Sequence, residues 1–201
     1  MKIISAAVAG VLASAGLAGT ARAVPITYTV SANEFVFLGF SASIRPVPVS
    51  ITGAGDTADA VTLAPGVLGI PLTSASFTTT IGGGTILTPL DFVVEQTTQT
   101  GGFFTSGLAS VLAESAAFFA TYDGITSAGP IAGLPAGATN ITVSVVTGSP
   151  LETTLTFGNG GNSYSFTAAT PSVVPEPMTL ALLGAGLIGL AATRRRGTPT
   201  A

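Results

Sequence analysis

Between residues 24 and 175, short runs rich in Val, Ile, Thr and Phe alternate with clusters of Gly, Pro, Asn and Ser. Short runs of this kind, separated by turn-forming residues, are typical of all-β domains. We expect strands at residues 26–30, 34–40, 44–51, 75–80, 91–97 and 140–147. The pattern therefore predicts a mainly β fold, a single antiparallel β-sandwich or β-rich domain that spans residues 24–170.

Two of these runs depart from simple alternation. Residues 34–40 are more continuously apolar, which indicates a strand covered on both faces. Residues 44–51 contain Pro46 and Pro48, and proline has no N–H to donate to a neighbouring strand. We therefore predict an edge strand or an extended loop over residues 44–51.

The last part of the domain has the pattern of a β-hairpin. Leu151, Thr153, Leu155 and Phe157 share one face, and Tyr164, Phe166 and Ala168 return on the matching face. The segment between them, residues 158–162, consists of Gly and Asn, which tolerate positive φ in turns. We predict that these two strands pair with each other.

Residues 107–122 are the exception to the β pattern. Their large apolar residues recur at helical spacing and the run is rich in Ala, which favours one helix near residues 107–122. Phe118 and Phe119 would also suit a strand.

The N-terminus has the three parts of a secretory signal peptide. Lys2 supplies the positive charge, residues 3–18 are apolar and small, and Ala21 and Ala23 supply the small residues of a cleavage site. We predict that signal peptidase removes residues 1–23, cutting after Ala23.

The C-terminus carries a second apolar segment with marked flanks. Residues 178–193 contain no charged residue and would form a helix of about 24 Å, against a hydrocarbon core of about 30 Å. A buried core helix could have the same length, but three adjacent arginines suit the cytoplasmic face of a membrane better than a core. We predict a linker with a Pro-Glu-Pro motif at 171–177, a transmembrane helix at 178–193 and a basic cytoplasmic tail at 194–201.

This arrangement resembles the sorting signal of PEP-CTERM proteins. The residues that carry the resemblance are Pro175, Glu176 and Pro177 before the apolar segment and Arg194, Arg195 and Arg196 after it. The resemblance implies export from a Gram-negative-type bacterium and processing near residues 175–177 by an exosortase, a membrane-embedded cysteine protease or transpeptidase. It often implies an association with exopolysaccharide or biofilm. It covers about the last 30 residues and implies nothing about the fold of the exported part.

The composition of the exported part excludes many kinds of chemistry. Residues 24–175 contain one basic residue, Arg45, and eight acidic ones, a net charge of −7, which disfavours nucleic acid as a partner. They contain no Cys, His, Trp or Lys, so disulfides, His/Cys metal sites and His- or Lys-activated nucleophiles are excluded. We therefore expect no cofactor and no enzymatic activity.

Two pairs of carboxylates remain as candidate sites. Asp56 and Asp59 follow a Gly-rich loop and are weak candidates for binding Ca²⁺, since two carboxylates alone are too few. Asp91 and Glu95 would share one face if they lie on one strand. Paired carboxylates can hydrolyse glycosides, but only at a separation of about 5 Å or about 6.5–9.5 Å and with the pKa of one raised.

Together these features favour an exported, non-catalytic protein of the cell surface or extracellular matrix, with a structural or adhesive role in exopolysaccharide or biofilm. It would cross the inner membrane, be anchored transiently and then reach the surface or the medium. Its expected partners are signal peptidase, the exosortase, the membrane and, as a further candidate, exopolysaccharide. A carboxylate-dependent enzyme acting on polysaccharide and a Ca²⁺-dependent binding module are the alternatives.

Overall fold

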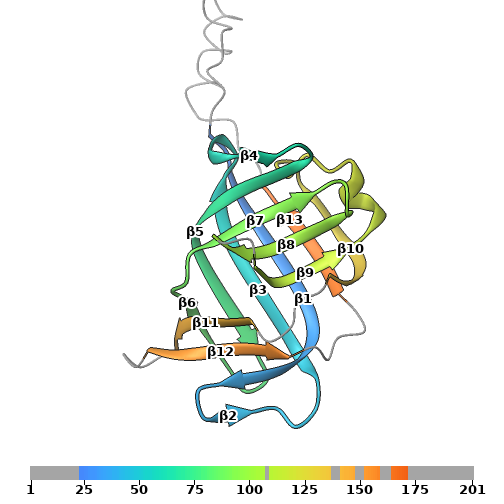
Figure 1. Ribbon diagram of the computed structural model, residues 1–201. Helices are drawn as coiled ribbons and strands as arrows, with labels where there is room; N and C mark the ends of the chain where they lie inside the picture. Colours follow the sequence, from blue (N-terminus) through green and yellow to red (C-terminus); the bar gives the residue numbers. More distant parts are fainter. Residues whose placement is uncertain (1–22, 107–108, 137–140, 148–151, 159–163, 172–201) are drawn as a thin grey trace, which may run out of the picture. The chain divides into compact units, whose positions relative to one another are not determined.

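A computed structural model describes residues 23–106, 109–136, 141–147, 152–158 and 164–171 (Figure 1). The prediction of a mainly β, antiparallel fold is confirmed, whereas a sandwich of two separate sheets is not found, because the described strands belong to one sheet. The strands are β1 (Pro25–Leu38), β2 (Ser41–Ala42), β3 (Val47–Asp56), β4 (Val61–Ala64), β5 (Val67–Thr79), β6 (Gly82–Ile86), β7 (Leu90–Glu95), β8 (Thr100–Thr105), β9 (Ser110–Ser115), β10 (Ala128–Pro135), β11 (Ile141–Val146), β12 (Glu152–Gly158) and β13 (Tyr164–Ala169). Two short 3₁₀ helices, η1 (Thr57–Asp59) and η2 (Ala117–Ala120), interrupt them.

The thirteen strands of this described part form one continuous sheet that closes on itself twice. One ring runs β5-β3-β1-β13-β10-β9-β8-β7 and returns to β5; the other runs β12-β11-β6-β5-β3-β1 and returns to β12. The rings share β1, β3 and β5. β1 and β5 are 14 and 13 residues long, which is long enough to take part in both rings. One end of each strand pairs within the first ring, with β13 or β7, and the other end pairs within the second ring, with β12 or β6.

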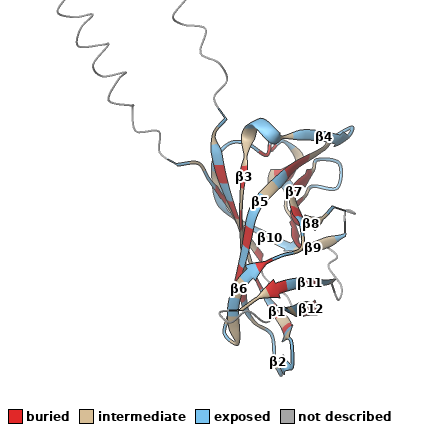
Figure 2. Ribbon diagram, turned by 90° about the vertical axis from the view of Figure 1, so that its left-hand side faces the viewer, coloured by how far each residue is buried: buried red, intermediate tan, exposed pale blue. Residues whose placement is uncertain are grey.

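Alternation along β1 shows how the sequence produces these rings. Ile26, Tyr28 and Val30 are buried inside, whereas Thr27, Thr29 and Ser31 between them face outward. Buried and more exposed positions likewise succeed one another along the other strands of the shared sheet (Figure 2). One apolar face per strand is what a closed antiparallel sheet requires.

Aromatic side chains fill the larger ring. Tyr28 stacks on Phe92 with ring centroids 3.8 Å apart, and Phe92 stacks on Phe166 at 5.3 Å. Phe119 packs where a side chain on Gly101 would stand, so this position in β8 requires glycine. The core therefore depends on residues from widely separated parts of the chain.

The prediction of an edge strand or an extended loop over residues 44–51 is right for its first part and wrong for its second. Residues 44–46 lie outside any strand, whereas from Val49 onward β3 lies between β1 and β5. Pairing with β5 begins at Val49, so Pro48 has a strand neighbour only on the β1 side, opposite Asn33. Its missing N–H therefore costs no bond to β5. The two strands expected at residues 26–30 and 34–40 form the single strand β1, which ends at Leu38 and leaves Gly39 and Phe40 in a turn.

The predicted helix near residues 107–122 is also wrong. Apart from residues 107–108, which lie outside the described residues, this segment contains β9 and the 3₁₀ helix η2. Residues 111–114 are all buried, and successive residues of a strand point to opposite faces, so β9 is buried on both faces. A run of this kind can suit a helix as well as a buried strand. Pairing with β8 and β10 outweighs the helix propensity of its alanines.

The predicted hairpin is right in its strands and wrong in its pairing. Leu155, Phe157 and Phe166 are buried, as expected. However, β12 pairs with residues 35–38 of β1, and β13 pairs with residues 27–32 of β1. Among the described pairings, β12 and β13 do not pair with each other. The turn residues 159–162 lie outside the described residues.

The signal peptide up to Arg22, including Ala21, and the whole sorting signal with Pro175, Glu176, Pro177 and Arg194–Arg196 lie outside the described residues as well. Ala23 is described and exposed. No helix within the described ranges has the length and apolar character needed to cross a membrane.

Candidate functional site

Two rows of hydroxyl groups cross the outer face of β13, β1, β3 and β5. Strand register places Thr29 opposite both Thr52 and Thr167, and Ser31 opposite both Ser50 and Ser165. Each row then continues onto β5. The first row consists of Thr167, Thr29, Thr52 and Ser76, and the second of Ser165, Ser31, Ser50 and Thr78. We call these eight residues the hydroxyl rows.

In each row, the hydroxyls that β1 and β3 contribute bond to each other. The Ser31 hydroxyl donates to that of Ser50 at 3.0 Å, and the hydroxyls of Thr29 and Thr52 are 3.2 Å apart. A hydroxyl has one donor and two acceptor positions, so a paired hydroxyl keeps part of its capacity for a ligand. With strands about 4.8 Å apart, the rows present a regular lattice of polar groups.

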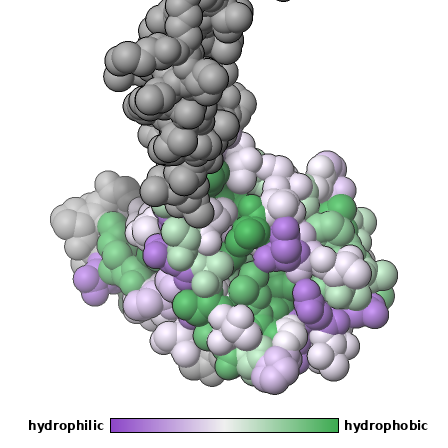
Figure 3. Space-filling view, turned by 90° about the horizontal axis from the view of Figure 1, so that it is seen from above, coloured by the Kyte–Doolittle hydropathy of each residue, from purple (hydrophilic) through white to green (hydrophobic). Residues whose placement is uncertain are grey.

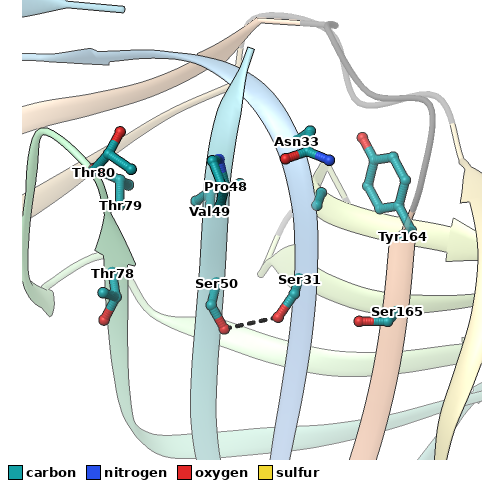
Figure 4. A pocket seen from close by; sticks show the side chains of 11 residues that line it. Ser31, Asn33, Pro48, Val49, Ser50, Thr78, Thr79, Thr80, Tyr164 and Ser165 are labelled. Carbon is teal, nitrogen blue, oxygen red and sulfur yellow. Dashed lines mark hydrogen bonds between the residues drawn. The ribbon is translucent and has the colours of Figure 1, made fainter.

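The second row opens into a groove of about 510 Å³ (Figure 4). Three strands of the shared sheet and β13 supply its walls. The lining residues are Ser31, Ala32, Asn33, Pro48, Val49, Ser50, Thr78, Thr79, Thr80, Tyr164 and Ser165, none of which carries a formal charge. The groove therefore suits a neutral ligand rich in hydroxyl groups better than an ionic one.

A buried polar contact fixes one wall of the groove. The Tyr164 hydroxyl of β13 donates a hydrogen bond to the Glu34 carboxylate of β1, and both residues are buried. Because a buried carboxylate needs such partners, this bond helps hold β13 against β1 beside the groove.

Glu114 is a different kind of buried acid. It lies in β9 opposite Gly101 and Pro135, is 0 % exposed, and neither carboxylate oxygen has a hydrogen-bond partner within the described part of the chain. A side chain on Gly133 would meet the Glu114 carboxylate, so β10 approaches closely there. Burial raises the pKa of Glu114 to about 7. No feature of the sequence distinguished Glu114 from the other acidic residues.

Two tyrosines of the core donate hydrogen bonds to backbone carbonyls. Tyr28 donates to the Gly124 carbonyl at 2.7 Å and Tyr122 to the Thr126 carbonyl at 2.7 Å. Burial is the main cause that raises the pKa of Tyr28 far above its usual range, and the neighbouring Tyr122 and Asp123 raise it further. Burial and Asp123 raise the pKa of Tyr122 in the same direction.

Asp123 closes the loop that follows Tyr122. Its carboxylate accepts from the backbone N–H groups of Ile125 and Thr126, each at 3.0 Å, and from the Thr126 hydroxyl at 2.9 Å. Partial burial acts to raise the pKa of Asp123, but the hydrogen bonds outweigh it and leave that pKa below its usual value. The contacts give Asp123 a role in shaping this loop.

The structure places the two carboxylate pairs away from the groove lining. Asp56 accepts from the Ala58 N–H at 2.8 Å and thereby caps η1, which contains Asp59. The described residues hold no group of three or more acidic side chains able to ligate a metal. Asp91 and Glu95 stand at opposite ends of β7, about 13 Å apart along the strand, beyond the spacing that glycosidases use.

Comparison with known proteins adds one finding to this geometry. Residues 173–196 match the PEP-CTERM protein-sorting motif. The match agrees with the resemblance seen in the sequence and supports an exported protein that is sorted by an exosortase, a membrane enzyme. No curated protein and no solved structure matches the chain.

Proposed function

We propose that the chain is a non-catalytic protein of the cell surface or extracellular matrix that adheres to neutral polysaccharide through the hydroxyl rows and the adjoining groove. The observation that carries this proposal is an uncharged, hydroxyl-lined groove on an exported protein that bears a sorting motif. Biofilm or capsule material is the setting in which such a role is useful.

The chemistry of the groove supports a glycan as ligand. Sugar hydroxyls both donate and accept, as the Ser and Thr side chains of the rows do. A neutral chain loses no charge solvation when it binds, whereas an anionic polymer meets a protein of net charge −7 between residues 24 and 175. Each contact is weak because a net hydrogen bond is worth about 1 kcal/mol, so adhesion depends on many contacts along an extended polymer.

Retention of the protein on an immobilised neutral polysaccharide, such as dextran, tests the proposal. Replacing Ser31 and Ser50 together by Ala is expected to weaken retention by about thirtyfold, since two hydrogen-bonding groups of about 1 kcal/mol each are lost. The double variant Thr142→Val, Thr156→Val is the matched control, because it removes a bonded hydroxyl pair at 2.7 Å that does not line the groove.

Equal retention of the two double variants would contradict a role for the groove. Retention on anionic alginate at least as strong as on dextran would contradict the neutral ligand. Release of reducing sugar from either polymer would contradict the non-catalytic assignment.

A further inference from the structure

Two exposed apolar arms lie at opposite ends of the domain. The arm at one end is formed by residues 39–46 around β2, where Phe40 is fully exposed and Ile44 is 97 % exposed. The arm at the other end is β4, where Val61 and Leu63 are 46 % and 44 % exposed. Figures 1 and 2 place β2 and β4 at opposite ends in both views.

Each arm also has an unpaired strand edge. Among the described strands, β2 pairs only with β1 and β4 pairs only with β5. An edge strand presents free backbone N–H and C=O groups, which form a template for a strand from another molecule. Figure 3 looks onto the end that carries β4 and shows hydrophobic residues there beside hydrophilic ones.

The two arms carry opposite charges. Arg45, the one basic residue between residues 24 and 175, follows Ile44 on the β2 arm. Asp56 ends β3, and Asp59 ends η1, the short 3₁₀ helix that leads into β4. Two β2 arms would bring Arg45 against Arg45, and two β4 ends would bring carboxylates together, so a contact between unlike ends is favoured over a contact between like ends.

We propose that the β2 arm of one copy docks on the β4 arm of a second copy of this chain. The exposed apolar side chains would pack together, the free edges would pair, and Arg45 would face Asp56 and Asp59. Because the two surfaces differ and lie at opposite ends, a pair of copies leaves one free arm of each kind, so association continues beyond the dimer. This self-association is independent of the proposed glycan binding.

Disulfide trapping tests this contact, because the whole sequence contains no cysteine. The full chain is produced in an exporting bacterial host, and intact cells are oxidised with diamide before denaturing electrophoresis. The double variant Ile44→Cys, Val61→Cys is expected to give a ladder of dimers, trimers and larger species. Each single variant alone is expected to remain monomeric. When the two single variants are produced together, dimers are expected but nothing larger, because each copy carries only one cysteine.

The control pairs Ile44→Cys with Leu134→Cys, because Leu134 is also exposed but belongs to β10. A ladder from this control equal to that of the test pair would overturn the proposal, as would dimers from either single variant or an absence of ladder from the test pair.

A charge exchange provides the second readout. Adding Arg45→Glu to the test pair is expected to lower the ladder yield by about threefold, the size of an exposed ion pair. Adding Asp59→Arg as well is expected to restore the ladder yield. Adding Glu152→Arg instead, which changes an exposed carboxylate outside both arms, is not expected to restore it. Equal rescue by both substitutions would overturn the assigned pairing of ends.

Discussion

At the scale of single residues, Glu114 is the group whose burial has the clearest consequence. An unpaired acid inside a protein is held more easily as the neutral carboxyl group than as the carboxylate. Its pKa of about 7, against an ordinary value of 4.5, means that the folded state keeps this proton longer than the unfolded chain does. Between these two values, the folded state therefore binds more protons, and stability falls as pH rises.

We expect the Glu114→Gln variant to lose this pH dependence. The free energy of unfolding of the parent should fall by about 3 kcal/mol, relative to the variant, between pH 4.5 and pH 7.5. Urea unfolding at a series of pH values measures the difference. Glu152→Gln, at an exposed position of β12, is the control and should follow the parent. Parallel curves for the parent and Glu114→Gln would show that Glu114 titrates normally.

At the scale of elements, β13 shows how one strand face supports the larger ring. Phe166 is 0 % exposed and stacks on Phe92, and it also contacts Phe119 at a centroid distance of 5.3 Å. These contacts join β13, β7 and η2, which are far apart in sequence.

Phe166→Ala is therefore expected to lower the free energy of unfolding by about 3–5 kcal/mol, because it removes buried surface and leaves a cavity. Phe40→Ala makes the same chemical change at a fully exposed site and is expected to change stability by less than about 0.5 kcal/mol. Chemical unfolding of both variants at low protein concentration compares them. A similar loss in both would mean that Phe166 is not a core residue.

Also at this scale, the failures of sequence-based prediction share one cause. The strand character of β12 and β13 and their apolar faces follow from local alternation, which has a period of two residues. Their partners do not, because both strands pair with β1, whose residues lie more than 100 positions away. Strand pairing also decides the structure of β9. Its alanine-rich pattern suits a helix, and pairing with β8, which directly precedes it, and with β10 favours an extended backbone instead.

At the scale of the whole molecule, the sorting motif at residues 173–196 governs where the protein goes. Glu176→Ala, or deletion of Arg194–Arg196, is expected to leave unprocessed precursor in the membrane. The physical reason is that an acidic boundary and the arginines would fix the depth and orientation of the predicted membrane segment. Mass spectrometry of the protein recovered from cells measures the outcome.

Glu152→Ala, a change of the same type in the exported domain, serves as the control for this prediction. It should leave the mature mass unchanged apart from the substitution itself. Normal processing of both sorting-signal variants would contradict the roles given to Glu176 and the arginines.

The sequence alone determined the sorting signal, the β character of the domain and the residue types that it lacks, because each of these can be read from adjacent residues or from composition. The signal peptide and the membrane helix stay predictions of the sequence. Only the tertiary structure decided that β1, β3 and β5 serve two rings and that Ser31 meets Ser50 in a groove. It also decided that no residue in the described ranges bonds to the Glu114 carboxylate. These features depend on which distant strands lie side by side, and pairing over long separations leaves no local trace in the chain.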